Sequence, residues 1–267
     1  MKSEKPKVSI IVNCHNGGKY LRECIESIIN QTYKNWEVIF YDNFSNDNSL
    51  SIIKKFKDKR IKIFRSKSFL SLYDARNKAI KFSTGKYIAF LDTDDWWINS
   101  KINDQITFLR KNKEYKIICT NVFLYNENNK KKKKWHLKLP SGKITQKLLD
   151  NYSIGISSIL IEKSIFKNNK FNKSYNIIGD YDLFIKLSIF NKIASLNTPL
   201  IFYRIHDSNF SNKKLHIYYL ELKNWLKKNE KMLKKNKLRV TKVKYLLFKL
   251  RIKTIIRKFK INFLKLF

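Results

Sequence analysis

Short apolar runs alternate with amphipathic segments along the first hundred residues of the chain. The apolar runs predict strands at residues 8–12, 36–41, 61–65 and 87–91, and the largely apolar runs at 8–12 and 87–91 are typical of buried strands. Apolar side chains recur at helical spacing between them, over residues 20–29, 49–56 and 73–82. Strands that alternate with helices predict an α/β fold with a doubly wound, mostly parallel sheet flanked by helices.

The pattern weakens after residue 97. It predicts helices at 102–109, 144–149 and 180–189, and strands at 116–125, 154–161 and 200–204. Segment 126–134 ends in consecutive lysines that repel one another, which predicts a solvated loop. We therefore expect one domain over residues 1–212, with halves 1–97 and 98–212, followed by a basic tail at 213–267.

Acidic residues follow two of the predicted strands. Asp42 ends the second, and Asp92, Asp94 and Asp95 follow the fourth. The ends of parallel strands meet at one edge of a sheet, so we expect these acids to line one crevice. Carboxylates this close repel one another unless a cation lies between them, and Mg²⁺ or Mn²⁺ with a diphosphate suits that arrangement. The alternative is a polar turn that caps the next helix, with Asp95 or Asn99 near its start.

Charge is the strongest bulk property of the chain, which carries a formal net charge of +36. This predicts attraction to nucleic acid, anionic lipid or phosphorylated substrates. Hydrophobic residues make up 43%, which excludes a disordered chain. The three cysteines are scattered and form no CxxC pair, so we expect free thiols in a reducing compartment. The first apolar run is too short for the core of a signal peptide, and a cytoplasmic protein is the corresponding expectation.

The tail interleaves lysine and arginine with aliphatic and aromatic residues, and its acids are Glu221 and Glu230. No apolar run there approaches the roughly 20 residues that span a bilayer. One interpretation is a set of basic amphipathic helices that lie on an anionic membrane surface. The other is a helical pair that packs on the domain with its basic face in water.

Several of these segments together resemble a family 2 glycosyltransferase of the GT-A fold. The resemblance runs nearly without interruption from residue 7 to residue 97. Its motifs are the first strand and its turn to Asn16, the helix with its Gln-Thr-Tyr exit at 31–33, the turn 42–47, the Ala-Arg-Asn element at 75–77 and the Asp-x-Asp signature at 92–94. The chain departs from the family pattern at Asn13 (usually proline), His15 (usually tyrosine), Asn43 (usually an acid) and Phe44 (usually glycine).

Two later segments are similar to further elements of the family. Gly179-Asp180-Tyr-Asp182 resembles the element that supplies the catalytic base, with Gly179 where a glutamate is common. Residues 203–206 resemble the Tyr-Arg-x-His segment that ends many of these domains.

The resemblance implies specific roles at the donor site. Asn16 would belong to the donor site, and Asp42 would accept hydrogen bonds from the nucleobase or ribose. Arg76 would hold the nucleotide, against the alternative of an exposed helix cation. Asp92 and Asp94 would hold the ribose and a divalent metal, Mn²⁺ or Mg²⁺.

It also implies a base and a further metal ligand. Asp180 would take the proton from the acceptor hydroxyl, against the alternative of a helix N-cap. His206 would ligate the metal or bond the diphosphate, against the alternative of a plain turn residue.

The function expected from the resemblance is metal-dependent, inverting transfer of a sugar from a nucleotide-sugar, a UDP-sugar above all, to a glycan. The acceptor would be lipid-linked or part of the cell envelope, and the enzyme would lie peripherally on the inner face of the cell membrane. One rival is a nucleic-acid-binding protein, although no motif for specific nucleic-acid recognition is present. Another is a nucleotidyltransferase, which needs a phosphate loop that Gly17, Gly18 and Lys19 supply only thinly.

Overall fold

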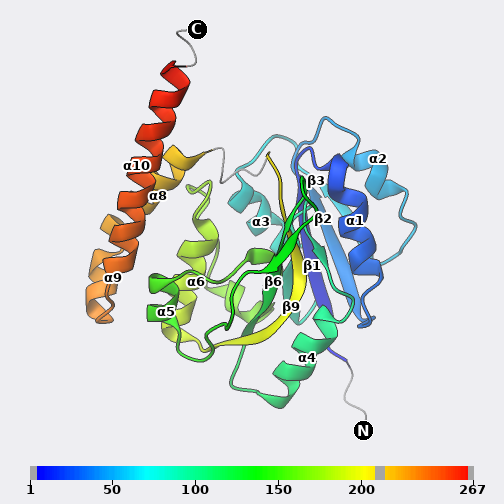
Figure 1. The fold of residues 1–267 in the computed structure, drawn as a ribbon. Helices are drawn as coiled ribbons and strands as arrows, with labels where there is room; N and C mark the ends of the chain where they lie inside the picture. The colour runs from blue at the N-terminus through cyan, green and yellow to red at the C-terminus, as the bar shows by residue number, and fades with distance from the viewer. Residues whose placement is uncertain (1–4, 208–213, 264–267) are drawn as a thin grey trace.

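The computed structural model describes residues 5–207 and 214–263. In these residues a nine-stranded twisted sheet runs through the molecule in the order β3-β2-β1-β4-β8-β6-β9-β5, with β7 beside β6. Helices cover both faces of the sheet (Figure 1). The predicted α/β architecture is confirmed.

The first four strands are parallel, as predicted. They are β1 (Val8–Cys14), β2 (Trp36–Asp42), β3 (Ile61–Arg65) and β4 (Tyr87–Phe90). Cys14 pairs with Asp42 in register, and Ile11 pairs with Phe90. The chain therefore leaves β1, β2 and β4 at the same edge of the sheet.

Successive residues of a strand point to opposite faces, and both faces are buried here. Ile10 belongs to one core cluster and its neighbour Ile11 to the other. The first cluster lies under α1 (Gly18–Ile29), α2 (Ser49–Lys54) and α4 (Lys101–Lys111). The second lies under α3 (Leu72–Lys81), α5 (Thr145–Asp150) and α6 (Gly179–Phe190). The burial of both faces explains why β1, β2 and β4 read as largely apolar runs, whereas β3, at the edge of the sheet, is partly exposed and carries Lys62 and Arg65.

The second half of the sheet mixes strand directions. It contains β5 (Trp96–Trp97), β6 (Ile117–Asn126), β7 (Lys132–Lys134), β8 (Leu160–Glu162) and β9 (Ile193–Ile205). Strand β9 runs parallel to β6 with register shifts, whereas the pairings β4–β8, β6–β8, β6–β7 and β5–β9 are antiparallel.

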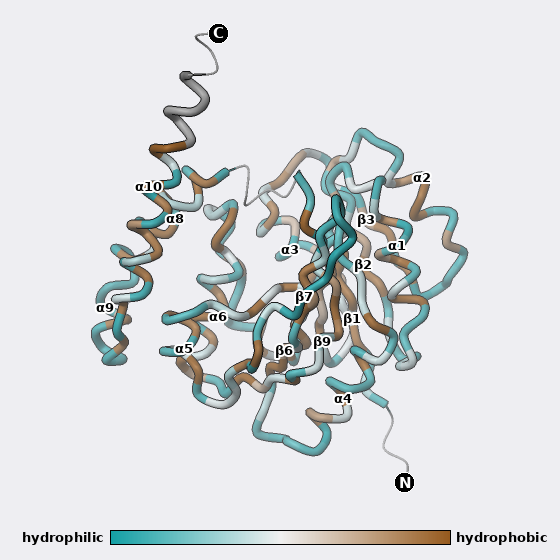
Figure 2. The backbone as a smooth tube through the Cα atoms, in the orientation of Figure 1, coloured by the Kyte–Doolittle hydropathy of each residue, from teal (hydrophilic) through white to brown (hydrophobic). Residues whose placement is uncertain are grey.

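Two predictions for this half are corrected. Segment 154–161 is not one strand, because a 3₁₀ turn η1 (Ile156–Ser158) precedes β8; a second, η2 (Lys163–Lys167), follows it. The predicted loop 126–134 contains β7, which pairs with β6. All three lysines of β7 are exposed, so water and salt weaken the repulsion between them and the strand can form. Figure 2 shows β7 as hydrophilic.

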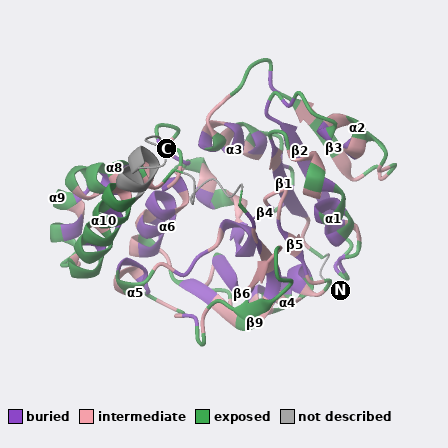
Figure 3. Cartoon of the chain, turned by 45° about the horizontal axis from the view of Figure 1, so that its top comes forward, coloured by how far each residue is buried: buried purple, intermediate pink, exposed green. Residues whose placement is uncertain are grey.

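The described part of the tail forms α8 (Leu215–Lys228), α9 (Glu230–Lys235) and α10 (Thr241–Phe263). Trp225 of α8 is fully buried, and Val243 and Leu250 anchor α10 in the same core. In Figure 3, α6 is largely buried whereas α9 and α10 are largely exposed. Among the described helices, none combines the length and the apolar character needed to cross a membrane. The boundary at residue 212 stays a prediction.

Candidate active site

The turn after β4 carries the acidic motif. Asp92 directly follows Leu91, and the backbone N–H of Asp95 donates to the carbonyl of Asp92 at 3.1 Å, which closes the turn. The Asp92 N–H donates to the hydroxyl of Ser157 at 3.2 Å. Cys24 is fully buried beneath this turn and donates from its thiol to the Asp92 carbonyl, at 3.8 Å. Contacts with Ser157 and with Cys24 of α1 therefore hold the backbone of this turn at the end of β4.

Arg76 joins three distant motifs. Its guanidinium is 2% exposed and donates to Oδ1 of Asp92 and to Oδ1 of Asp180, each at 2.7 Å. Burial alone lowers the pKa of Arg76, but the charges of Asp180 and Asp92 outweigh it and raise that pKa above its ordinary value. The alternative of an exposed helix cation is wrong, because the ion is buried and doubly paired.

Asp180 lies in the first turn of α6 and faces a hollow. The N-cap of α6 is Ile178, so the N-cap alternative for Asp180 is wrong. The carboxyl group keeps 21% of its side-chain exposure. Burial raises the pKa of Asp180 to about 6, against the opposing charge of Arg76. A carboxyl group poised there exchanges protons readily near neutral pH.

Asp94 contacts His206, with 3.0 Å between Oδ2 and Nε2. Burial raises the pKa of Asp94, the charge of Asp92 raises it further, and the hydrogen bond with His206 opposes both. In the part of the chain that the structure describes, no group of three or more His, Cys, Asp or Glu side chains is arranged to hold a metal ion.

Asp95 supports the turn and does not cap a helix. It is 2% exposed and accepts from the Ser157 hydroxyl at 2.7 Å and from the Arg204 N–H at 3.2 Å. Burial raises the pKa of Asp95 well above its usual range, and the charges of Asp94 and Asp92 add to this. The expected cap is corrected: α4 begins at Lys101 and its N-cap is Ser100.

Arg204, near the end of β9, holds the same turn. The sequence assigned Arg204 no role of its own. Its Nε donates to the Asp94 carbonyl at 3.0 Å, and its guanidinium also pairs with Glu23. Its flat cation lies 4.7 Å from the ring centre of Tyr20 and 4.4 Å from that of Trp96. The contact between β9 and the Asp-x-Asp turn spans more than a hundred residues of sequence, which local patterns do not reveal.

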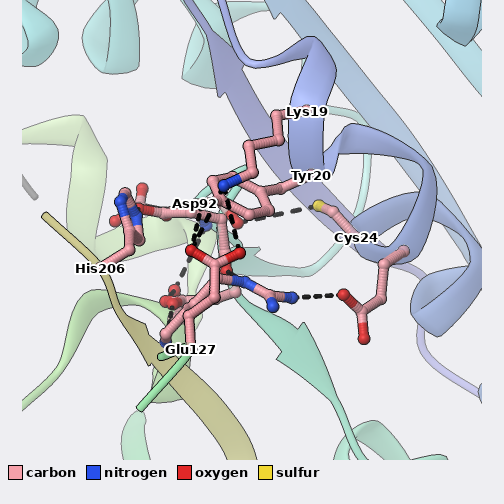
Figure 4. Close-up of polar contacts among 11 residues, drawn as sticks. Lys19, Tyr20, Cys24, Asp92, Glu127 and His206 are labelled. Carbon is pink, nitrogen blue, oxygen red and sulfur yellow. Dashed lines mark hydrogen bonds and ion pairs between the residues drawn. The ribbon is translucent and has the colours of Figure 1, made fainter. Parts of the chain in front are cut away.

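Tyr20 and Glu127 lie near His206 (Figure 4). The Tyr20 hydroxyl donates to Glu127 at 2.7 Å, and Lys19 pairs with the same carboxylate at 3.2 Å. The Tyr20 ring lies 5.0 Å from the His206 ring. His206 is thus held between Asp94 and an aromatic face, unlike a plain turn residue.

Asn16 and Asp42 form a separate group at the ends of β1 and β2. Asp42 is fully buried, pairs with Arg65 at 3.1 Å and accepts from the Ser45 N–H. Asn16 accepts from the Asn46 N–H at 2.9 Å, so its side chain ties the two turns together. Their contacts with the donor stay predictions. Phe44, which replaces a usual glycine, has φ of 62°, the left-handed conformation that glycine adopts most easily.

A pocket of about 430 Å³ opens in front of Arg76, Asp92, Asp94 and Asp180. Its remaining walls are mostly apolar or aromatic, with Tyr73, Tyr152, Tyr181, Tyr203, Tyr218 and several isoleucines. Among the described residues, the buried hydroxyls of Tyr152 and Tyr181 have no hydrogen-bond partner. Flat rings around a few polar groups suit a sugar, which is polar at its edges and apolar on its faces.

Comparison with known proteins gives a consistent picture. A family model described as glycosyl transferase family 2 matches residues 9–174. The UDP-Glc:alpha-D-GlcNAc-diphosphoundecaprenol beta-1,3-glucosyltransferase WfgD of Escherichia coli is 32% identical over 209 residues, which cover 78% of this chain and 80% of that protein. WfaP of the same species, with the same described activity, is 34% identical over 217 residues and covers the same shares.

Solved structures share the fold. Staphylococcus aureus TarS 1–349 in complex with UDP-GlcNAc superposes with a TM-score of 0.67 at 18% identity, over 82% of this chain and 66% of that one. The mannosyltransferase PcManGT of Pyrobaculum calidifontis, in complex with GDP-Man and Mn²⁺, gives 0.65 at 13% identity, over 86% and 65%. This chain thus spans about two thirds of either structure.

Proposed function

This chain belongs to glycosyl transferase family 2, and from that premise we propose that it transfers a sugar from a UDP-sugar to a hydroxyl group of a lipid-linked glycan of the cell envelope. It is a glycosyltransferase by family. The observation that carries the proposal is the double ion pair of Arg76, which joins the Asp-x-Asp turn to Asp180 at the wall of one pocket. The two Escherichia coli relatives, named for UDP-Glc and a diphosphoundecaprenol-linked acceptor, support the substrate classes.

In the proposed reaction Asp180 acts as the general base. Its carboxylate takes the proton of the acceptor hydroxyl while that oxygen forms a bond to the anomeric carbon of the donor sugar. The bond from that carbon to the diphosphate breaks with its electron pair, so nucleoside diphosphate leaves. A single displacement of this kind inverts the anomeric configuration. Arg76, bonded to one oxygen of Asp180, would keep the carboxylate turned toward the pocket.

Asp94 and His206 fit a divalent cation such as Mn²⁺, with Asp92 beside them. The supporting observation is that Oδ2 of Asp94 lies 3.0 Å from Nε2 of His206, which places a carboxylate oxygen beside an imidazole nitrogen. Carboxylate oxygen and imidazole nitrogen suit Mn²⁺, and substrate phosphates and water would complete the shell. When bound, the cation would offset the charge that grows on the leaving diphosphate. PcManGT, of the same fold, is described with Mn²⁺.

On the donor side, we propose that Asp42 and Asn16 shape the nucleoside site through the turns that they hold. Both side chains are engaged by neighbouring backbone N–H groups. Arg76 is buried and points at Asp92, so its effect on the nucleotide would pass through that carboxylate.

The pH dependence of transfer should report the ionisation of Asp180. A base works only when deprotonated, and burial places its pKa at about 6. We therefore expect kcat/KM to be constant at higher pH and to fall about tenfold per unit as the pH drops below that value. The measurement is a pH–rate profile with UDP-sugar and a lipid-linked acceptor.

UDP affinity measured over the same pH range is the control, because it separates protonation of the base from loss of the donor site. A profile that stays flat to about one unit below the expected pKa would contradict the assignment.

For the tail, we propose an anionic membrane surface as the partner of α10. The helix has two apolar stripes on opposite sides. Val243 and Leu250 face the core, whereas the outward stripe is 40% to 60% exposed and comprises Tyr245, Phe248, Ile252, Ile255 and Ile256. Basic side chains flank the outward stripe: Lys242, Lys244, Lys249, Arg251 and Lys253. Figure 2 shows the resulting mixture of hydrophilic and hydrophobic residues along α10. An exposed apolar stripe between cations matches a lipid interface with anionic headgroups.

We expect the protein to sediment with vesicles that contain phosphatidylglycerol, and much less with vesicles of phosphatidylcholine alone. Phe248→Ser and Ile252→Ser together should reduce partitioning at least about tenfold, because each removes about 1.5–3 kcal/mol of burial. Leu137→Ser is the matched control, since Leu137 is an exposed aliphatic residue at 95%, outside the tail. Wild-type protein that stays in the supernatant with anionic vesicles would refute this part of the proposal.

A further inference from the structure

Glu221 of α8 has its carboxylate turned into the protein. It is one of two acids in residues 213–267 and is 9% exposed. Three consecutive backbone N–H groups donate to it: Asn176 at 2.6 Å, Ile177 at 2.9 Å and Ile178 at 3.2 Å. The Asn176 side-chain amide adds a fourth bond at 3.1 Å. A buried carboxylate with this many donors is strongly localised.

The segment that Glu221 holds ends directly before the proposed base. Ile178 is the N-cap of α6, has no side-chain capping bond of its own, and precedes Asp180 by two residues. Tyr73 of α3 also contacts this segment: its hydroxyl donates to the Ile177 carbonyl at 2.7 Å. A Cβ added at Gly179 would lie 2.5 Å from Cε2 of the Tyr73 ring, too close for any side chain. Segment 176–179 is thus fixed between α3 and α8.

The same face of α8 makes two further contacts with the site. Trp225, one turn after Glu221, donates from Nε1 to Oδ1 of Asp182 at 2.8 Å and packs edge-on against Tyr181, 4.9 Å between ring centres. Tyr218, one turn before Glu221, lines the pocket of Asp180. Residues at these spacings share one side of a helix, so α8 presents a continuous surface to the start of α6.

We infer that α8, although it belongs to the basic tail, is part of the catalytic apparatus, and that Glu221 is a positioning residue for Asp180 and for the 176–178 wall of the pocket. The inference rests on the proposed function. It follows from the order of contacts: Glu221 fixes three amides, these amides set the start of α6, and the start of α6 sets the Asp180 carboxylate. A displacement of about 1 Å at a reacting group costs up to about a hundredfold in rate.

The test compares Glu221→Gln with Glu230→Gln. Glutamine at 221 keeps the shape but replaces one accepting oxygen with an NH₂ group, which cannot accept from the segment. We expect kcat for transfer to fall between about tenfold and about a hundredfold, with UDP affinity unchanged within about twofold. Glu230 is 60% exposed and pairs with Lys234, so its variant should match the wild type. Unchanged kcat in Glu221→Gln, or equal losses of kcat and UDP affinity, would overturn the inference.

Amide hydrogen exchange of residues 176–178 gives a readout that needs no substrate. Exchange of the amides that face the new NH₂ group should be at least about tenfold faster in Glu221→Gln than in the wild type or Glu230→Gln, because those amides lose their acceptor while the remaining oxygen still accepts. Unchanged exchange would overturn the inference even if transfer falls. If wild-type protein transferred no sugar, the proposed function would fail while exchange still reported the positioning. If Glu221→Gln does not fold, Trp225→Phe replaces it as the test variant, because phenylalanine keeps a ring but removes the bond to Asp182. We then expect faster exchange in the first turn of α6, and unchanged exchange there would overturn the inference.

Discussion

Replacing Asp180 with asparagine is expected to lower kcat for sugar transfer by about 10²- to 10⁴-fold, the usual contribution of a general base. Asparagine keeps an oxygen that accepts from Arg76, so the buried cation retains this partner. The side chain loses its capacity to take a proton, and the effect should therefore fall on the chemical step. The measurement is transfer to a lipid-linked acceptor with each UDP-sugar of a panel, together with UDP affinity by calorimetry.

Asp182→Asn is the matched control for this prediction. Asp182 sits in the same helical turn, but its carboxylate accepts from Trp225 and pairs with Lys186 at 2.6 Å, away from the proposed reaction. An asparagine oxygen still accepts from the indole, so transfer should fall less than about tenfold. Near-normal turnover of Asp180→Asn, or a larger loss in Asp182→Asn, would remove Asp180 as the base.

Replacing Asp94 with alanine is expected to abolish the stimulation of transfer by Mn²⁺, a loss of about 10²- to 10³-fold at saturating metal. Asp94 is the carboxylate in contact with His206. Its removal takes away the carboxylate ligand of the proposed cation and leaves the imidazole of His206. Calorimetry of Mn²⁺ binding in the presence of UDP gives a second readout, in which the affinity should fall in parallel.

Asp150→Ala provides the comparison, because Asp150 is an exposed acid whose contact is with Gln146 on α5. Its Mn²⁺ response should equal that of the wild type. Undiminished Mn²⁺ stimulation in Asp94→Ala would place the cation elsewhere and leave the contact with His206 as a purely structural one.

Sequence patterns predicted the first half of the fold well because β1, β2 and β4 are buried on both faces and read as apolar runs, whereas β3 is a partly exposed strand at the edge of the sheet. Strand β3 nevertheless begins and ends at the predicted residues, and α3 is displaced by one residue. The second half was harder. Strand β9 extends from Ile193 through Pro199 to Ile205, and its polar and partly exposed middle hides the first part of the strand. Its pairing with β6 shifts register near Asn121, so no regular alternation marks it.

For the candidate site, the sequence supplied the acids but not the groups that hold them. Asp92, Asp94 and Asp180 follow from the resemblance of their motifs to those of family 2 glycosyltransferases. The burial of Arg76 and the inward turn of Glu221 depend on contacts that join residues 104 and 45 positions apart, respectively. Acids in a lysine-rich tail look like solvated residues, and only the packing of α8 on α6 distinguishes Glu221 from Glu230.

The ring of Tyr73 packs against Gly179, so the side chain allowed at either position depends on the side chain at the other. A glutamate is common in the family where Gly179 stands, yet here its first carbon would collide with the aromatic ring. An acid at 179 would therefore require a smaller side chain at 73, and that exchange would also remove the hydroxyl that grips the Ile177 carbonyl. In this chain the ring of Tyr73 fills the space of a second acid beside Asp180, the proposed base, so the neighbourhood of Asp180 carries one negative charge fewer.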